Sequence, residues 1–264
     1  MLMKSLYKIF MILLLVQSTT NAVTLNNDRD TILELGMEMS DMRNMLEAYI
    51  LIGAKVDYKN PTQKLKDGMV HYEELLRVIK VKYPLNTEIQ ESISTSLNAW
   101  KIVKSAMELA LGNANLEALK KGAIFIHGNI RTVIKEMAHM KKILLDTSRL
   151  KNKEALNASI EIAASARRLS AHYMMDLWHL NDPTIQKHWN KGLKIYADSL
   201  EILKTSPFVN NHQFNVLLKN SIKLHKYFTR MGEKSKIFSI LIDKKANIAF
   251  NEAKEMTNII LQSK

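Results

Sequence analysis

The feature that most constrains the fold of this chain is a pattern that occurs twice, 124 residues apart. The segments GMVHYEELLRVIK (68–80) and GLKIYADSLEILK (192–204) carry Gly, Tyr, Leu and Lys at the same positions. The identical pairs are Gly68 and Gly192, Tyr72 and Tyr196, Leu76 and Leu200, and Lys80 and Lys204. Tyr72 and Leu76 are four residues apart and therefore share one face of a helix. This repetition predicts an internal duplication of a helical unit.

The composition predicts an all-α fold. Gly and Pro account for only 8 and 4 of the 264 residues, and the abundant residues Leu, Ala, Lys, Glu and Met are strong helix formers. No segment shows the sustained alternation of apolar and polar residues that a half-buried strand requires. Signals for helix starts and stops divide the chain into eight helices. The predicted helices span residues 28–54, 61–81, 87–112, 115–147, 153–180, 183–205, 211–231 and 235–262.

Local residue types predict how several of these helices begin and end. Asn60 before Pro61 supplies an N-cap and a first-turn proline for the second helix. Thr87 and Gln90 have the spacing of a capping box at the start of the third helix. Gly112 follows that helix, where a left-handed cap is expected.

The first 22 residues have the pattern of a secretory signal peptide, because two lysines precede an apolar run from Ile9 to Val16. This run is too short to span a hydrocarbon core, which takes about 20 residues of helix. We therefore expect removal of residues 1–22 and a soluble periplasmic protein, with an uncleaved membrane anchor as the alternative. The mature chain is predicted to form two tandem repeats, 23–148 and 149–264, each an up-down four-helix bundle.

Several functional classes are disfavoured by the sequence. The chain has no cysteine, which excludes disulfides and thiolate metal sites. Its formal charge of +12 is spread among acidic residues, a pattern typical of a solvated basic surface rather than a nucleic-acid surface, although it attracts small anions. The histidines lack the spacing of di-metal bundles, and no phosphate loop, nucleophile elbow or catalytic triad is present. We expect no cofactor, no metal and no enzymatic activity.

Two segments resemble one family of sensor domains. The segment IAASARRLSAHYMMDLW (162–178) resembles the signature helix of the PilJ-type and NarX-like domains of type IV pilus chemotaxis transducers and nitrate/nitrite sensor kinases. The segment MLEAYILIGAKVDYKNP (45–61) resembles the continuation of that signature. The matching residues are Ala163, Arg167, Leu169 and Ser170 in the second repeat and Gly36, Met45, Leu46, Tyr49, Leu51, Ile52 and Gly53 in the first.

The resemblance implies a periplasmic helical sensor in which arginines from adjacent first helices hold an oxyanion. Guanidinium groups suit planar anions because they donate two parallel hydrogen bonds. The chain departs from the signature where its second arginine is expected, since His172 and Asn44 stand there, and Met39 replaces the first arginine in the first repeat. The predicted ligand-binding residues are Arg167, Arg168, Ser170 and His172 in the second repeat and Arg43 and Asn44 in the first.

Helix geometry leaves alternatives open for these residues. Arg167 has alanines and Met174 one turn away, which indicates either a ligand site at a helix contact or a stem that keeps its charged head in water. Arg168 and His172 share a polar stripe, so a solvated Arg168 and an exposed neutral His172 are the alternatives to a ligand site. If the first helices of both repeats meet, Arg43 and Asn44 would face Arg167 and His172.

Two functions are consistent with these features. The first is an exported, non-enzymatic, sensor-like protein that binds a small anion of the nitrate/nitrite class and signals through a membrane sensor kinase or chemotaxis transducer. The alternative is a helical protein-interaction or scaffold module whose ligand site has decayed. The two differ in whether the Arg167 region forms a closed polar pocket. Homo-oligomerisation stays open.

Overall fold

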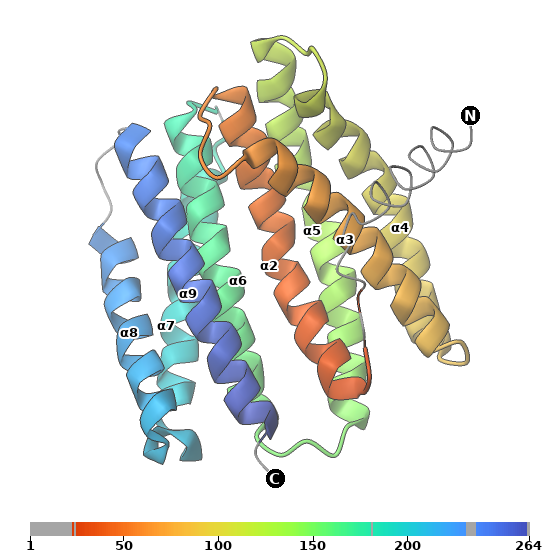
Figure 1. Ribbon diagram of the computed structural model, residues 1–264, viewed down its shortest axis with the longest axis vertical. Helices are drawn as coiled ribbons and strands as arrows, with labels where there is room; N and C mark the ends of the chain where they lie inside the picture. The colour runs from red at the N-terminus through yellow and green to blue at the C-terminus, as the bar shows by residue number, and fades with distance from the viewer. Residues whose placement is uncertain (1–22, 24, 181, 231–235, 263–264) are drawn as a thin grey trace, which may run out of the picture.

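The computed structural model of the protein describes residue 23 and residues 25–180, 182–230 and 236–262 (Figure 1). Within these ranges the chain forms eight α-helices and two short 3₁₀ helices and contains no strand, which confirms the all-α class. None of these helices is both long and apolar enough to cross a membrane. The predicted signal peptide, 1–22, lies outside the described residues. The helices are α2 (Asp28–Gly53), α3 (Pro61–Lys82), α4 (Thr87–Glu108), η1 (Leu109–Leu111), α5 (Leu116–Thr147), α6 (Lys153–Leu177), α7 (Ile185–Lys204), η2 (Pro207–Asn210), α8 (His212–Arg230) and α9 (Lys236–Gln262).

The N-termini of these helices are capped mainly by asparagine side chains. The predicted cap of α3 is confirmed, because Asn60 Oδ1 accepts a hydrogen bond from the Gln63 amide at 3.1 Å. The predicted capping box of α4 is wrong. Asn86, one residue earlier, caps this helix by accepting from the Ile89 amide at 3.0 Å. Gln90 instead donates to main-chain carbonyls at the end of α3.

The predicted left-handed cap at Gly112 is also wrong. Gly112 has φ −107° and ψ −158°, which is an extended conformation that any residue adopts. The 3₁₀ turn of Leu109–Leu111 tightens the end of α4 first, so the chain leaves the helix without a left-handed residue. The helix α7 begins at Ile185 rather than at 183, after a turn in which Asp182 Oδ1 accepts from the Thr184 amide at 2.8 Å.

The helices α2 and α6 lie side by side at the centre of the molecule (Figure 1). In the first half, α2 contacts α3 and α5, and α4 contacts α3 and α5. In the second half, α6 contacts α7 and α9, and α8 contacts α7 and α9. The buried apolar side chains of both halves belong to one contiguous core. Because α2 and α6 each have neighbours on several sides, polar side chains on them are buried between helices.

Small residues allow α2 and α6 to approach closely. A Cβ atom added at Gly36 of α2 would lie 2.8 Å from Cγ2 of Ile160 in α6. These two residues are 124 apart in the sequence, the same interval as the repeated pattern. The first helices of the two halves, α2 and α6, therefore contact each other at equivalent positions.

The chain leaves α2 and α6 by the same sequence of main-chain hydrogen bonds. The amides of Ala54 and Trp178 donate to the carbonyls four residues earlier at 2.8 and 3.0 Å. The next residues, Lys55 and His179, are left-handed, with φ values of 55° and 54°. Four successive donors recur at an interval of 124 residues: Ala54, Lys55, Val56 and Tyr58 in the first half and Trp178, His179, Leu180 and Asp182 in the second.

The second helix of each half approaches the first helix at a glycine. A Cβ atom at Gly68 would lie 2.7 Å from Cγ of Met45, and one at Gly192 would lie 3.2 Å from Cδ2 of Leu169. Both the glycines and their neighbours are 124 residues apart. The glycines shared by the repeated sequence segments therefore occupy equivalent packing positions.

Candidate functional site

The contact between α2 and α6 divides the predicted ligand-binding residues into two groups. Arg167 and Ser170 lie on the side of α3 and α9, since Arg167 bonds to α9 and Ser170 lies beside Glu47 of α2. Arg43, Arg168 and His172 lie on the side of α5 and α7. Asn44 is half-buried, and its side-chain oxygen has no hydrogen-bond partner among the described residues. The six residues therefore do not form one site.

Arg167 is neutralised by carboxylates of the protein itself. Its Nη1 lies 3.5 Å from Asp243 Oδ1 and 3.7 Å from Glu47 Oε2, and its Nη2 donates to Asn247 Oδ1 at 2.7 Å. The side chain is only 2 % exposed, so the alternative of a solvated head group is wrong. Lys64 adds a second cation, 3.4 Å from Asp243 Oδ1. We call Glu47, Lys64, Arg167, Asp243 and Asn247 the acidic network.

Glu47 is the least well paired member of the acidic network. It is fully buried, and neither carboxylate oxygen has a hydrogen-bond partner among the described residues. Burial raises the pKa of Glu47 to about 8, although Arg167 and Ser170 act in the opposite direction. Burial opposes ionisation of this carboxyl group and the nearby Arg167 favours it, so its charge depends on that cation. At neutral pH Glu47 is therefore largely protonated, and the ion pairs of the acidic network join Asp243 to Arg167 and Lys64.

Three histidines that are far apart in the sequence meet on the other side of the α2–α6 contact. His127 Nε2 lies 3.1 Å from His172 Nε2, and the ring of His188 stacks on that of His172 with centroids 5.6 Å apart. Arg131 of α5 donates a hydrogen bond to His188. We call Arg43, His127, Arg131, Arg168, His172 and His188 the basic cluster. The residues come from α2, α5, α6 and α7.

The basic cluster brings like charges close together in a partly buried environment. Burial and repulsion from Arg168 lower the pKa of Arg43 to about 9, although Glu161 acts in the opposite direction. Burial likewise lowers the pKa of Arg168. Burial, His127 and Arg43 hold the pKa of His172 well below its usual range. The prediction of an exposed His172 is wrong, because its side chain is 6 % exposed.

Two buried nitrogen atoms of the basic cluster lack hydrogen-bond partners. Arg168 Nη1 and His172 Nδ1 bond to no other described residue. Buried polar groups of folded proteins are nearly always paired, and several other buried polar atoms of the described residues, among them Arg167 Nε, also lack a partner. Arg131 is exposed and His188 is half-buried, so the basic cluster reaches the surface. An anion that enters there would pair with the free Arg168 nitrogen.

The hydrogen bonds fix how the histidines are protonated. Burial raises the pKa of Asp182, but hydrogen bonds from Thr184 and His127 lower it overall, so this carboxylate accepts from His127 Nδ1 at 2.9 Å. His127 Nε2 then accepts from His172 Nε2 when both rings are neutral. His172 Nδ1 is left with a lone pair, and it becomes a donor only when His172 binds a proton.

The sequence missed half of the basic cluster. His127, Arg131 and His188 lie on helices that meet only in the fold, and their spacing matches no local motif. The geometry does not make a metal site, since no group of three or more His, Asp or Glu residues in the described ranges could hold a metal ion.

The register of the two first helices also differs from the prediction. The resemblance aligned Met39 with Arg167, whereas the repeated hydrogen bonds at an interval of 124 residues align Arg43 with Arg167. The difference is four residues, about one helical turn. Comparison with protein-family models, with curated proteins and with solved structures gives no match for this chain.

Proposed function

We propose that the chain is an exported, non-enzymatic, sensor-like protein that binds a small oxyanion of the nitrate/nitrite class in the basic cluster. In this proposal residues 23–148 and 149–264 form two tandem PilJ-like repeats, each an up-down four-helix bundle, joined through α2 and α6. A membrane sensor kinase or chemotaxis transducer would receive the signal in the periplasm.

The duplication is supported by agreement between sequence and backbone. The repeated sequence pattern, the hydrogen bonds that end α2 and α6, and the glycine contacts share the interval of 124 residues. In each half the first and fourth helices also contact each other, as a closed bundle requires. On this alignment, Arg43 is equivalent to Arg167, and His188 is equivalent to Lys64.

The observation that carries the anion proposal is the unpaired Arg168 Nη1 in the basic cluster. Arg167 Nε is also unpaired, and the alignment supports placing the anion at Arg168 rather than at Arg167. Arg167 has Glu47 beside it, whereas the position equivalent to Glu47 in the second half is Ala171. One side of the α2–α6 contact therefore contains the acidic residues Glu47 and Asp243, and the other lacks an acidic residue at the position equivalent to Glu47.

The chemistry of the basic cluster favours a small oxyanion. Guanidinium groups of Arg43 and Arg168 can donate to oxygen atoms in a plane, and a buried anion requires such pairing. Protonation of His172 would supply one more donor at Nδ1, so anion binding is expected to strengthen as the pH falls.

Calorimetric titration of the mature protein with nitrate, nitrite, sulfate and chloride tests the proposal. We expect binding of a nitrate-class anion that weakens about 10- to 100-fold in Arg168→Met, because a hydrogen bond to a charged group is lost. Arg77→Met is the matched control, since Arg77 is exposed and pairs with Glu74 on α3, and it should bind the anion normally.

A second variant tests the role assigned to the missing carboxylate. Ala171→Glu places a carboxylate at the position equivalent to Glu47 and should abolish anion binding while raising the pKa of Arg43. Absence of binding by the folded wild-type protein, or equal binding by wild type and Arg168→Met, would overturn the proposal. Either result would favour the scaffold alternative.

A further inference from the structure

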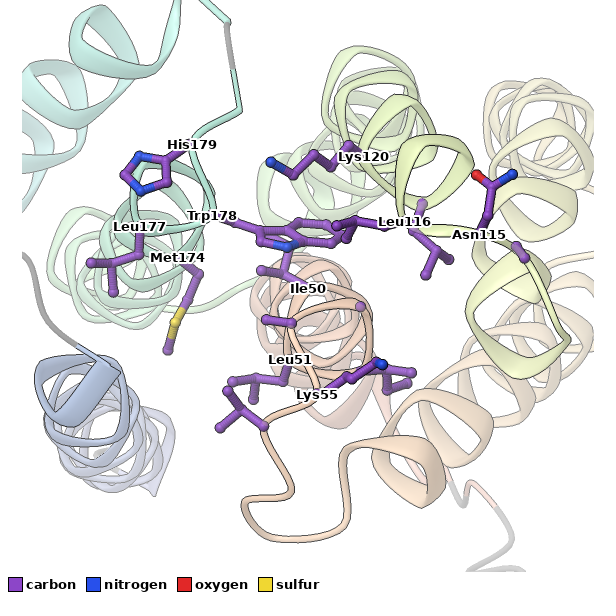
Figure 2. A pocket seen from close by; sticks show the side chains of 16 residues that line it. Ile50, Leu51, Lys55, Asn115, Leu116, Lys120, Met174, Leu177, Trp178 and His179 are labelled. Carbon is purple, nitrogen blue, oxygen red and sulfur yellow. The ribbon is translucent and has the colours of Figure 1, made fainter.

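The ends of α2 and α6 and the start of α5 enclose a cavity of about 700 Å³ (Figure 2). This volume lies within the range of pockets that hold small organic ligands, about 300–1,000 Å³. The cavity does not include any residue of the basic cluster. It is therefore separate from the proposed anion site.

The walls of the cavity are mainly apolar. They include Ile50, Leu51, Leu119, Met174, Leu177 and Trp178. Figure 2 shows the Trp178 indole between Ile50 of α2 and Lys120 of α5. Trp178 is held against Gly53, where an added Cβ atom would lie 2.4 Å from the ring. The indole is thus a fixed wall of the cavity rather than a mobile side chain.

The charged residues of the cavity are all basic. Lys55 and Lys120 line it, and no Asp or Glu does. Neither lysine forms a hydrogen bond or ion pair with another described residue, whereas the adjacent Lys121 lies 3.4 Å from Glu117. Lys120 is half-buried, whereas Lys55 is exposed. Two unpaired ammonium groups beside an apolar wall are complementary to a ligand that has both an anionic head and an apolar tail.

We propose that this cavity binds an amphipathic carboxylate, such as a medium-chain fatty acid, with its tail against Trp178 and its carboxylate at Lys120. Lys55, on the other side of the indole, adds positive charge to the same cavity (Figure 2). Leu116 lines the cavity and is 55 % exposed, so the tail can enter at that point. The mouth is formed by residues at one end of the molecule, where α2 and α6 both turn. The ligand would therefore contact both halves of the chain.

Decanoate below its micellar concentration is the probe, with decanol and decyltrimethylammonium as the neutral and cationic counterparts. Calorimetry should show that decanoate binds at least 10-fold more tightly than either counterpart. Lengthening the alkyl chain should raise affinity by about fourfold per methylene, since the burial of each additional methylene contributes a similar transfer free energy.

Substitutions test whether the two lysines and the mouth at Leu116 determine binding. Lys55→Met with Lys120→Met should remove the preference for decanoate over decanol, and Lys121→Met is the matched control that should keep it. Leu116→Trp narrows the mouth and should weaken all three ligands in a chain whose melting temperature is unchanged. Arg168→Met should leave decanoate binding intact, so that failure of the oxyanion proposal does not affect this test.

Three results would overturn the proposal: no binding of decanoate to the folded wild-type protein, equal affinities for the three decyl compounds, or an undiminished preference for decanoate in the double lysine variant. If the first result is accompanied by binding to vesicles that contain anionic lipid, the chain binds a membrane surface instead.

Discussion

Arg167 and Arg168 are adjacent in the sequence and have different electrostatic surroundings. Successive residues of an α-helix point about 100° apart, so the two guanidinium groups enter different helix contacts. Arg167 is buried near Glu47 and Asp243, whereas Arg168 is affected by the carboxylate of Glu161 and by like charges on Arg131 and Arg43. The pairing of each arginine depends on residues of α2, α5 and α9 that the local sequence does not reveal.

The buried histidines predict how stability depends on pH. An unfolded imidazole binds a proton below about pH 6.5, whereas the folded-state pKa of His172 lies well below that value and that of His188 is lowered to about 4. Below pH 6.5 these two side chains therefore bind more protons in the unfolded state, and their contribution to the free energy of unfolding falls as the pH falls. For the buried His172 this fall is at most about 1.4 kcal/mol per pH unit. The raised pKa values of buried carboxyl groups such as Glu47 act in the opposite direction.

Urea unfolding between pH 4.5 and 7.5 measures this effect, with His172→Gln as the comparison. The variant should lose less stability toward pH 4.5 than the wild type, because Gln does not titrate. Carboxylates titrate in both proteins, and their contribution cancels in the difference. Parallel pH profiles of the two proteins would contradict the buried, neutral state of His172.

At this scale the sequence indicated the correct residue types but only part of their arrangement. Arg43, Arg168 and His172 were predicted ligands and do come together. Arg167 and Ser170 do not join them, because the opposite side of α6 faces α9. His127 and His188 could be found only by knowing that α5 and α7 flank α6.

At the scale of the helices, the sequence was most informative about where each element lies. Asn60 was correctly predicted as a cap because Pro61 follows it. At the start of α4, the spacing of Thr87 and Gln90 predicted a capping box, but Asn86 is the cap. The prediction was wrong because Gln90 reaches back to α3 rather than to its own helix. Tertiary contact thus overrides a local motif.

This difference between Asn86 and Thr87 can be measured. Asn86→Ala should lower the free energy of unfolding by about 1 kcal/mol, since the hydrogen bond to the Ile89 amide is lost. Thr87→Ala is the matched control at an exposed neighbouring position, and it should change stability by less than about 0.5 kcal/mol. Chemical denaturation at pH 7 gives both values. A larger loss of stability in Thr87→Ala than in Asn86→Ala would show that Thr87 caps the helix.

At the scale of the molecule, the shared core predicts cooperative unfolding of the two halves. Apolar residues of both halves form one cluster, and α2 and α6 contact each other. A destabilising change in one half should therefore lower the stability of the other. Leu203 is fully buried in α7, and Leu203→Ala should cost about 2–5 kcal/mol.

The test uses Trp100, which is buried in the first half, as the reporter in a chain carrying Trp178→Phe and Trp189→Phe. Leu203→Ala in this background should lower the denaturation midpoint seen by Trp100 fluorescence as much as that seen by circular dichroism. An unchanged Trp100 midpoint would show that the halves unfold independently.

The packing of α2 on α6 takes place within a single polypeptide, so dilution cannot separate the two helices. In a symmetric dimer of one repeat, every substitution would appear on both sides of the twofold axis. On the proposed duplication, each side is encoded separately. Arg43 and Arg167 could therefore diverge, one remaining among cations and the other acquiring carboxylate neighbours. Such a molecule would take up one oxyanion per chain at any protein concentration, where a symmetric pair would offer two identical sites.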